Sequence, residues 1–291
     1  MFDDKIFITK CTVIDGIYDC LNKETQENRI KKVEIATYSE RADEFDEKKM
    51  LNLTLEHQEI LMPLMNLPKG STILEIGGGD GRFAFYLMKN GYTVIESDIA
   101  LGSVQKTKSI ADKHNILNGV FAIIDAENLP FKDESLDGIF MVASLHHLPY
   151  PEKAIVEFNR CLKNNGYLLI LREPASWQYK LFGPIFWIIR MIARNKNKNL
   201  FSLADDETRG FSIKQLKQLL FNFSNIELKP TSYLYKCYYN FLLLLKKFSG
   251  KPIKENIKIK TFLKKLDNFI KKLPIIKNCC WDWDIYCRKK G

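Results

Sequence analysis

An apolar run that ends in a carboxylate and a cluster of glycines is the feature that most constrains how this chain can fold. The segment reads Ile73-Leu-Glu-Ile-Gly-Gly-Gly-Asp-Gly-Arg-Phe83, and an apolar helical pattern continues from Arg82 to Lys89. Glycines let the backbone adopt left-handed angles and approach a ligand closely, and the first turn of a helix presents unpaired N–H groups. The segment therefore predicts a strand, a nucleotide-binding loop and a helix.

Two interpretations of this loop differ in the nucleotide that it binds. The spacing Gly79-x-Gly81-x-x-Ala84 fits the dinucleotide fingerprint and would indicate a nicotinamide or flavin enzyme. Glu75 precedes the first glycine by two residues, where its charge would repel a pyrophosphate but attract a ligand that carries a cation. The arrangement Glu-x-Gly-x-Gly-x-Gly from Glu75 to Gly81 resembles the first motif of class I S-adenosylmethionine-dependent methyltransferases.

A second acid ends the next predicted strand, Tyr92 to Asp98. Asp98 follows Gly81 by seventeen residues, close to the spacing at which an α/β fold brings a carboxylate to ribose hydroxyls. Asp98 also matches the acid that the family has at the end of this strand. Glu96, two residues earlier on the same face, is the alternative, and an exposed acid at a strand end is the purely structural interpretation.

A third segment resembles the adenine-contacting loop and the fourth strand of the same family. It runs from Ile123 to Phe131 and continues through residues 132–140. The resemblance implies that Asp125 binds the adenine amino group and that Ala126 offers its backbone N–H to the ring, whereas a surface loop is the alternative. The resemblance implies S-adenosyl-L-methionine as the cofactor, no metal, and cofactor contacts from Tyr38, Glu75, Gly77, Gly78, Gly79, Asp98, Ile99, Asp125, Ala126 and Ala143.

Two adjacent histidines follow the fourth strand, at the edge where the methyl group of such a cofactor would point. A neutral imidazole of His146 or His147 could accept a hydroxyl proton there, so both are candidate catalytic bases. Capping or packing is the alternative role for each, and Glu173 is a further candidate. A helix from Glu152 to Lys163, C-capped by Asn164-Asn-Gly166, and a strand from Tyr167 to Leu171 are predicted to follow.

Length and composition predict one enlarged domain, because 291 residues with 46% hydrophobic content can bury a full core around one sheet. The resemblance implies an α/β Rossmann-like sheet of seven mostly parallel strands in the order 3-2-1-4-5-7-6, with strand 7 antiparallel and helices on both faces. We expect an N-terminal extension (1–35), a cofactor-binding core (36–174) and a C-terminal part (175–291). The last would hold a lid insertion, strand six (225–233), strand seven (282–288) and a basic helical insertion at about 235–280.

The seven cysteines include no C-x-x-C pair, which argues against a disulfide framework and against a zinc site. The segment between Cys11 and Cys20 faintly resembles the end of a zinc-ribbon module, and we expect a small strand pair without metal. Tyr38 to Phe45 resembles the family's first helix, so Tyr38 would close over the methionine end of the cofactor. The N-terminus lacks a secretory pattern, which predicts a cytoplasmic protein.

The C-terminal region carries nearly all of the charge asymmetry. Residues 246–291 hold fourteen Lys and Arg against four Asp and Glu, whereas the rest of the chain is close to neutral. From Ile257 to Leu273, apolar residues recur at helical spacing among lysines, which predicts a basic amphipathic helix. Such a helix can dock on the protein body, contact an anionic membrane or receive a lipid-linked substrate, while nucleic-acid binding is disfavoured by the lack of a known module. The apolar run from Trp177 to Ala193 is too short to span a bilayer.

The resemblance is to the small-molecule, quinone-methyltransferase-like group (methyltransferase type 11) of the family. It implies transfer of a methyl group to oxygen or carbon of a small acceptor, apolar or lipid-linked. The alternatives are an NAD(P)-binding oxidoreductase, opposed by Glu75 and by the block from Asp125 to Gly166, and a non-catalytic domain that binds a cofactor or a partner.

Overall fold

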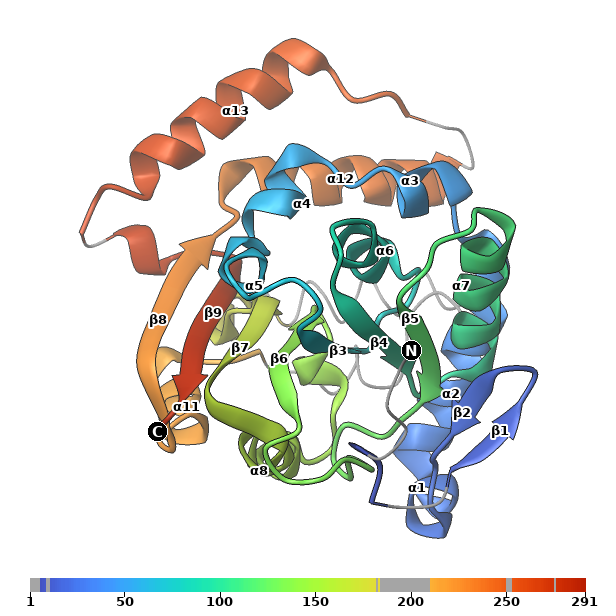
Figure 1. Cartoon of the computed structure of the whole chain (residues 1–291). Helices are drawn as coiled ribbons and strands as arrows, with labels where there is room; N and C mark the ends of the chain where they lie inside the picture. The colour runs from blue at the N-terminus through green and yellow to red at the C-terminus, as the bar shows by residue number, and fades with distance from the viewer. Residues whose placement is uncertain (1–5, 9–10, 182, 184–209, 250–252, 275) are drawn as a thin grey trace.

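One nine-stranded sheet organises the chain (Figure 1). The computed structural model describes residues 6–8, 11–181, 183, 210–249, 253–274 and 276–291. The strands are β1 (Thr12–Ile14), β2 (Ile17–Asp19), β3 (Thr72–Ile76), β4 (Thr93–Asp98), β5 (Gly119–Ile123), β6 (Leu136–Val142), β7 (Leu162–Pro174), β8 (Phe223–Thr231) and β9 (Asp282–Lys289).

The predicted seven strands are β3 to β9, and the sheet order β5-β4-β3-β6-β7-β9-β8 is the one expected for them. β9 is antiparallel to both β7 and β8, as expected. The predicted number of strands is wrong, because the N-terminal extension adds two strands at the β5 edge. β2 pairs with β5 in parallel, and β1 pairs with β2 in an antiparallel hairpin.

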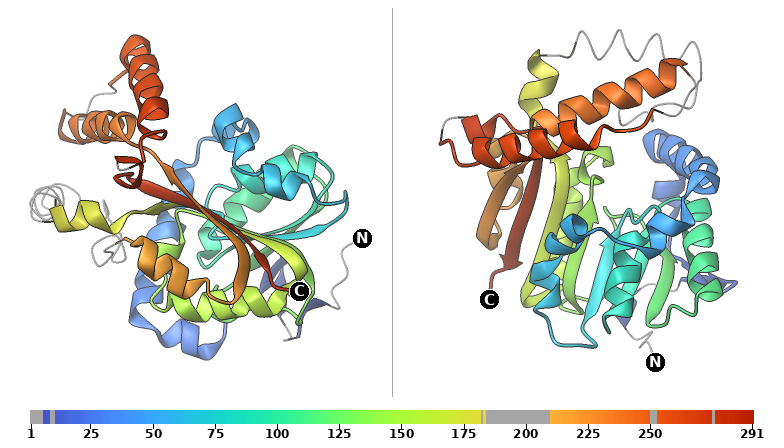
Figure 2. Two further views of the ribbon diagram at one scale, coloured as in Figure 1. Left: turned by 90° about the vertical axis from the view of Figure 1, so that its left-hand side faces the viewer. Right: turned by 90° about the horizontal axis from the view of Figure 1, so that it is seen from above.

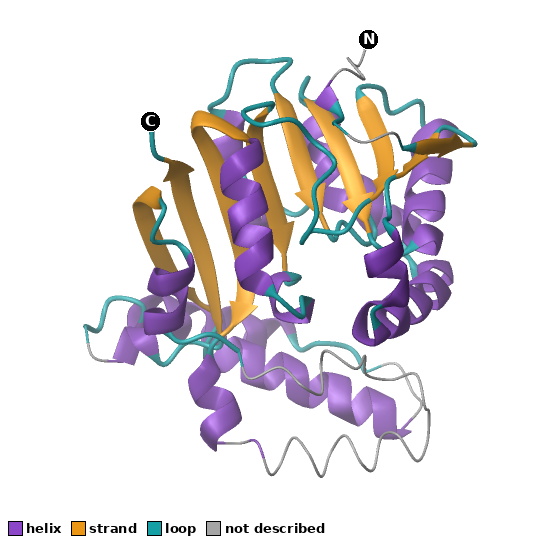
Figure 3. Ribbon diagram, turned by 90° about the horizontal axis from the view of Figure 1, so that it is seen from below, coloured by secondary structure: helices purple, strands orange, loops and turns teal. Residues whose placement is uncertain are grey.

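Helices cover both faces of the sheet (Figure 3). On one face, α6 (Arg82–Lys89) and α7 (Leu101–Lys113) pack on Ile73 and Val94. On the other face, α8 (Pro151–Cys161) and α11 (Ile213–Leu219) pack on Leu74 and Ile95. Apolar residues therefore line both sides of the parallel strands, the usual pattern for a sheet with two covered faces. The short N-terminal helices are α1 (Lys23–Glu27), α2 (Arg29–Arg41), α3 (Glu47–Leu51), α4 (Leu55–Glu59) and α5 (Met62–Met65), and two further helices, α12 (Leu234–Ser249) and α13 (Ile257–Ile270), lie between β8 and β9.

Helix α6 has the predicted bounds, and α11 begins after an N-cap, Ser212. The Ser212 hydroxyl accepts from the Gln215 N–H, and the Gln215 side chain accepts from the Ser212 N–H, which forms a full capping box. The C-cap predicted for the helix over Glu152 to Lys163 is wrong. Helix α8 ends at Cys161, and residues 162–166 already belong to β7, because Leu162 pairs with Leu136 of β6.

The cysteine prediction is corrected at the N-terminus, where Cys11 and Cys20 form a disulfide bond that closes the β1–β2 hairpin. The strand pair itself is present as expected, and no group of three or more potential metal ligands occurs in the part of the chain that the structure describes. Most of the predicted lid segment, Trp177 to Ala193, lies outside the described residues.

Helices α12 and α13 stand at the edge of the molecule, with α13 farther from the sheet than α12 (Figures 1 and 2). The Asp267 carboxylate of α13 accepts hydrogen bonds from the Leu234 and Tyr235 N–H groups, so it caps the start of α12. Among the described residues, no helix is both long and apolar enough to cross a membrane.

Candidate functional site

A cavity of about 620 Å³ lies at the carboxyl ends of β3, β4 and β6. Ligands of open α/β sheets bind at this edge, and the volume suits a small organic molecule. The structure brings all ten predicted cofactor-binding residues to the wall of this cavity, together with His147, whereas His146 does not line it. The ten are Tyr38, Glu75, Gly77, Gly78, Gly79, Asp98, Ile99, Asp125, Ala126 and Ala143.

The glycine loop leaves β3 with a backbone that only glycine adopts readily. Gly77 and Gly79 have φ values of 63° and 55°. A Cβ at Gly77 would come within 2.7 Å of the Ser144 hydroxyl, whereas at Gly79 it would meet nothing within 4 Å. The loop is therefore packed on the protein at its first glycine and open at its third, where a ligand can approach the backbone.

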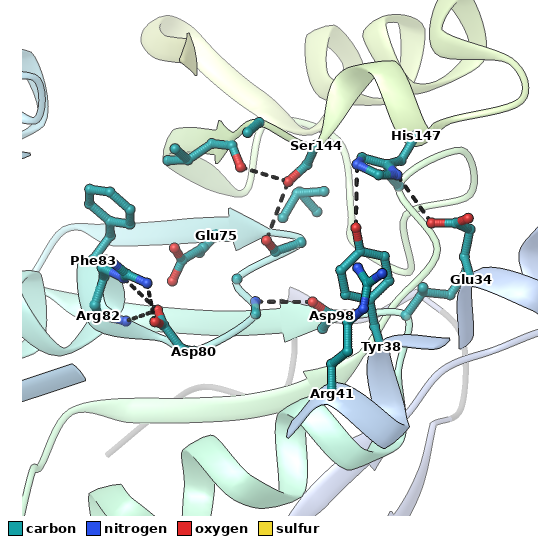
Figure 4. A pocket seen from close by; sticks show the side chains of 18 of the residues that line it. Glu34, Tyr38, Arg41, Glu75, Asp80, Arg82, Phe83, Asp98, Ser144 and His147 are labelled. Carbon is teal, nitrogen blue, oxygen red and sulfur yellow. Dashed lines mark hydrogen bonds and ion pairs between the residues drawn. The ribbon is translucent and has the colours of Figure 1, made fainter. Parts of the chain in front are cut away.

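Glu75 lies beneath this loop, buried on the face of β3 that α6 covers (Figure 4). Its carboxylate accepts the Ala84 N–H at 3.2 Å. Burial, with Asp80 nearby, raises the pKa of Glu75 well above its usual value. Within the described residues no basic side chain pairs with Glu75, so a cation that enters the cavity would find this carboxyl without a counter-ion.

Glu96 is the neighbour of Glu75 across the β3–β4 ladder and is buried completely. Neither carboxyl oxygen of Glu96 has a hydrogen-bond partner among the described residues. Burial and the proximity of Glu75 raise the pKa of Glu96 well above its usual value. Glu96 does not line the cavity, so Asp98 rather than Glu96 is the acid of β4 that faces it.

Asp98 joins the end of β4 to the glycine loop. Its carboxylate accepts the Gly79 N–H at 3.0 Å and the Ala100 N–H at 2.9 Å. Burial raises the pKa of Asp98, and these backbone hydrogen bonds oppose the rise. Asp98 thus positions the open glycine of the loop and keeps its own carboxylate at the cavity wall.

Asp125, at the end of β5, is held by residues from the N-terminal helices. Its Oδ2 accepts the Lys31 ammonium at 2.6 Å and the Thr25 hydroxyl, and its Oδ1 accepts the Glu127 N–H. Lys31 also pairs with Glu127 at 2.6 Å, and all three charged side chains are buried. Burial alone would lower the pKa of Lys31, but the hydrogen bonds to Asp125 and Glu127 outweigh it and raise that pKa.

The two histidines lie in different environments although they are adjacent. The Nδ1 of His147 is 3.1 Å from the Glu34 carboxylate, and its Nε2 is 3.4 Å from the Tyr38 hydroxyl (Figure 4). The Nδ1 of His146 is instead 2.9 Å from Glu173, which also accepts the Ser144, Leu145 and His146 N–H groups. Glu173 therefore serves to fix the turn, and only His147 faces the cavity.

Lys31, Glu34 and Tyr38 come from one face of α2, at spacings of three and four residues. Sequence inspection singled out only Tyr38, because charged residues surround this helix and no apolar stripe marks its buried face. Burial of Lys31 and Glu34 depends on acids and a histidine more than ninety residues away in the chain. Their opposite charges at helical spacing were the one available indication.

His57, another residue that the sequence did not single out, lines the cavity near Phe83. The two rings meet edge to face with centroids 5.5 Å apart. Burial, with the positive charges of Arg172 and Arg82, lowers the pKa of His57, which keeps its ring neutral at pH 7. This side of the cavity therefore combines an aromatic wall with an uncharged imidazole.

Comparison with known proteins identifies the central part of the chain. Residues 74–170 match the protein family described as "Methyltransferase domain". Over these residues the chain is similar to methyltransferase domains. The match confirms the resemblance to class I S-adenosylmethionine-dependent methyltransferases and, with it, S-adenosyl-L-methionine as the cofactor of the domain. It favours this interpretation of the glycine loop over the dinucleotide one.

Two curated relatives each match part of this chain. An S-adenosyl-L-methionine-dependent Diels-Alderase of Talaromyces variabilis is 39% identical over 125 residues, which cover 41% of this chain and 43% of the relative. The phthiotriol/phenolphthiotriol dimycocerosates methyltransferase 1 of Mycobacterium ulcerans is 31% identical over 143 residues, 47% of this chain and 49% of the relative. The chain thus spans less than half the length of each of these relatives.

Solved structures share the fold. A Haloferax volcanii protein described as a putative methyltransferase, in complex with the Trm112 methyltransferase activator, superposes with a TM-score of 0.55 at 14% identity. The match covers 87% of this chain and 98% of that one. At this identity the likeness shows the architecture of the methyltransferase domain and its surrounding elements.

The residues at the cavity fit S-adenosyl-L-methionine. The open backbone at Gly79 gives close access, and Asp98 stands where hydroxyl groups could donate to it. Glu75 and Asp98 have no basic partner among the residues described, which suits a ligand with a sulfonium and an ammonium group. Asp125 has both oxygens engaged by Lys31, Thr25 and the Glu127 N–H, so a contact with the adenine amino group would use the remaining lone pairs.

Proposed function

We propose that this chain is an S-adenosylmethionine-dependent methyltransferase that acts on oxygen or carbon of a small acceptor, apolar or lipid-linked. One observation carries the proposal. The acidic residues predicted to bind the cofactor line the same cavity as His147. A sulfonium cofactor supplies an already activated methyl group, so the protein needs to align the acceptor and, for a hydroxyl, to remove a proton.

The cofactor half of the proposal assigns a role to each carboxylate. Asp98 accepts the ribose hydroxyls, Asp125 and the Ala126 N–H hold the adenine, and Glu75 stabilises positive charge near the glycine loop. Tyr38, Gly77, Gly78, Gly79, Ile99 and Ala143 complete the contacts. Arg82 forms an ion pair with Asp80, which reduces the negative charge at the loop to the two acids beneath it.

His147 is the candidate general base, and Glu34 positions it. When the Glu34 carboxylate accepts the Nδ1 hydrogen, the Nε2 atom keeps its lone pair and can accept a proton from an acceptor hydroxyl. The Tyr38 hydroxyl, 3.4 Å from Nε2, marks the place where such a hydroxyl would stand. His146 has its Nδ1 turned to Glu173, away from the cavity, and is the weaker candidate.

The nature of the acceptor is inferred from the cavity wall and from a relative. Phe45, Phe83, Val142 and Leu148 contribute apolar surface near His147 and His57. The Mycobacterium ulcerans relative is named for a dimycocerosate methyl acceptor, which is a lipid. The other relative is named a Diels-Alderase, so cofactor binding without methyl transfer is the alternative function.

A methyl-transfer assay tests the proposal. The protein is incubated with S-adenosylmethionine labelled in its methyl group and a panel of phenols, quinols and hydroxylated lipids, while calorimetry with S-adenosylhomocysteine reports cofactor binding. We expect His147→Ala to lower kcat by roughly a hundredfold to ten-thousandfold without loss of cofactor affinity.

His146→Ala is the matched control, and we expect it to retain more activity than His147→Ala. Glu34→Gln should shift the pH dependence of kcat, because it weakens the partner of the His147 Nδ1. Cofactor binding without labelled product from any acceptor would favour the Diels-Alderase-like alternative, and failure to bind S-adenosylhomocysteine would exclude the proposal.

A further inference from the structure

The outer helix of the C-terminal hairpin exposes two aromatic rings among lysines. In α13, Phe262 is 62% exposed and Phe269 is 60% exposed. Lys258 and Lys265 lie on the same helix and Lys272 lies just after its end, and all three are exposed as well. We call these five residues the Lys–Phe ridge.

The spacing of the ridge places its members on one side of the helix. From Lys258 to Lys272 the steps are four, three, four and three residues, which keeps successive side chains on one face. Asp267, which α13 uses to cap α12, lies on another face and is buried. The ridge therefore faces away from α12, on the helix that stands farthest from the sheet in Figure 1.

The ridge lysines keep their charge unneutralised. Lys260 and Lys264, on the inner side of α13, pair with Glu255 and Glu56. Lys258, Lys265 and Lys272 form no ion pair with any side chain that the structure describes. The surrounding segment, residues 246–291, has ten more basic than acidic side chains, so the ridge is complementary to a surface with many negative charges.

We propose that the Lys–Phe ridge docks on the surface of an anionic lipid bilayer. Phenyl rings partition into the boundary between headgroups and acyl chains, and lysines beside them reach anionic headgroups. A duplex nucleic acid would use the lysines but has no place for two apolar rings. Two exposed phenyl rings bordered by lysines without ion pairs are therefore more complementary to a lipid surface than to water.

The position of α13 connects this surface with the cavity. Lys264 forms an ion pair with Glu56 of α4, and the next residue, His57, lines the cavity. Docking would therefore hold the acceptor side of the cavity close to the bilayer. The docking itself is independent of methyl transfer, so either proposal can fail while the other stands.

Co-sedimentation of the full chain with sucrose-loaded vesicles tests the inference. One set consists of phosphatidylcholine alone, and the other of phosphatidylcholine and phosphatidylglycerol at roughly three to one. We expect retention on the anionic vesicles at low salt and little on the neutral ones. Replacing Lys258, Lys265 and Lys272 together by Gln should lower partitioning by roughly a hundredfold, since each lysine near anionic lipid contributes severalfold.

Control variants distinguish a specific effect of the ridge from a general effect of surface charge or exposed apolar area. The triple variant Lys132→Gln, Lys214→Gln and Lys217→Gln removes three exposed lysines elsewhere, and Phe221→Ser with Leu117→Ser removes two exposed apolar side chains elsewhere. We expect both controls to bind like the parent, and Phe262→Ser with Phe269→Ser to lose at least roughly tenfold. Equal thermal melting of all variants would confirm that folding is unaffected.

Three outcomes would overturn the inference. The first is absence of retention on anionic vesicles at low salt. The second is an equal loss in the ridge and control variants, which would show a diffuse charge effect. The third is that the ridge is a nucleic-acid surface, shown by a mixed-sequence DNA duplex that displaces the vesicles and binds the phenylalanine variant as well as the parent.

Discussion

The acidic side chains at two parts of the cavity have different kinds of partners. Beside the glycine loop, Glu75 and Asp98 accept hydrogen bonds from backbone N–H groups and, within the described chain, have no basic partner. At the end of β5, Asp125 and Glu127 share the buried Lys31 ammonium. The difference shows that buried acids alone do not define a cation site, because only the first pair leaves carboxyl groups without a basic partner for a ligand to pair with.

The largest expected effect concerns Lys31. Lys31→Met would leave Asp125 and Glu127 buried without a counter-ion, and removing one partner of a buried ion pair costs about 3–5 kcal/mol. We expect the free energy of unfolding, measured by urea denaturation, to fall by about this amount. Adding Asp125→Asn and Glu127→Gln should restore part of it.

Thr25→Val is the control for Lys31→Met at the same carboxylate. It removes a hydrogen bond from a neutral hydroxyl to the Asp125 carboxylate, for which we expect a loss of about 1.5–3 kcal/mol. If Lys31→Met cost no more than Thr25→Val, the buried ion pair would not be what holds this end of the cavity together.

A smaller effect is expected at Asp98, where the consequence concerns binding. Asp98→Asn keeps an oxygen for the Gly79 N–H but removes the charge that faces the ligand. A hydrogen bond to a charged group contributes about 1.5–3 kcal/mol, so calorimetry should show roughly tenfold to hundredfold weaker binding of S-adenosylhomocysteine. Glu152→Gln, on an exposed acid of α8, should leave that affinity unchanged. Equal weakening by both would point to net charge rather than to Asp98.

The smallest expected effect is the pH dependence that Glu96 contributes. Because burial raises its pKa in the folded state, folded protein binds more protons than unfolded protein between the usual pKa and the raised one. The contribution of Glu96 to the free energy of unfolding is therefore fully present below about pH 4.5 and is lost as the pH rises through the raised pKa. Glu96→Gln should raise the free energy of unfolding at pH 7.5 by about 1–2 kcal/mol.

At pH 4.5 the same substitution should give no such gain, because Glu96 is largely protonated there in the folded state. Thermal melts of both proteins at the two pH values measure the difference. A gain of equal size at pH 4.5 would mean that packing, rather than the charge of Glu96, is responsible.

Much of the sheet and of the cofactor side could be predicted because the relevant residues are close in sequence. The strand, the glycine loop and α6 lie within twenty residues, Asp98 is the last residue of β4, and Asp125 lies two residues after the end of β5. The helix boundary at Cys161 was mispredicted because Asn-Asn-Gly resembles a C-cap, while pairing of Leu162 with β6 extends β7. The sequence did not predict that β1 and β2 join the main sheet, because no local sequence pattern indicates which strand pairs with the edge of β5.

Residue type and local spacing were enough to predict the glycine loop, the acids at or near the ends of β3, β4 and β5, and the basic character of the C-terminal helices. Only the tertiary structure decided which acids are neutralised and which histidine faces the cavity. Lys31 and Glu34 reach Asp125 and His147 across more than ninety residues of chain. Burial removes water from such pairs, so their charge depends on neighbours that only packing brings together.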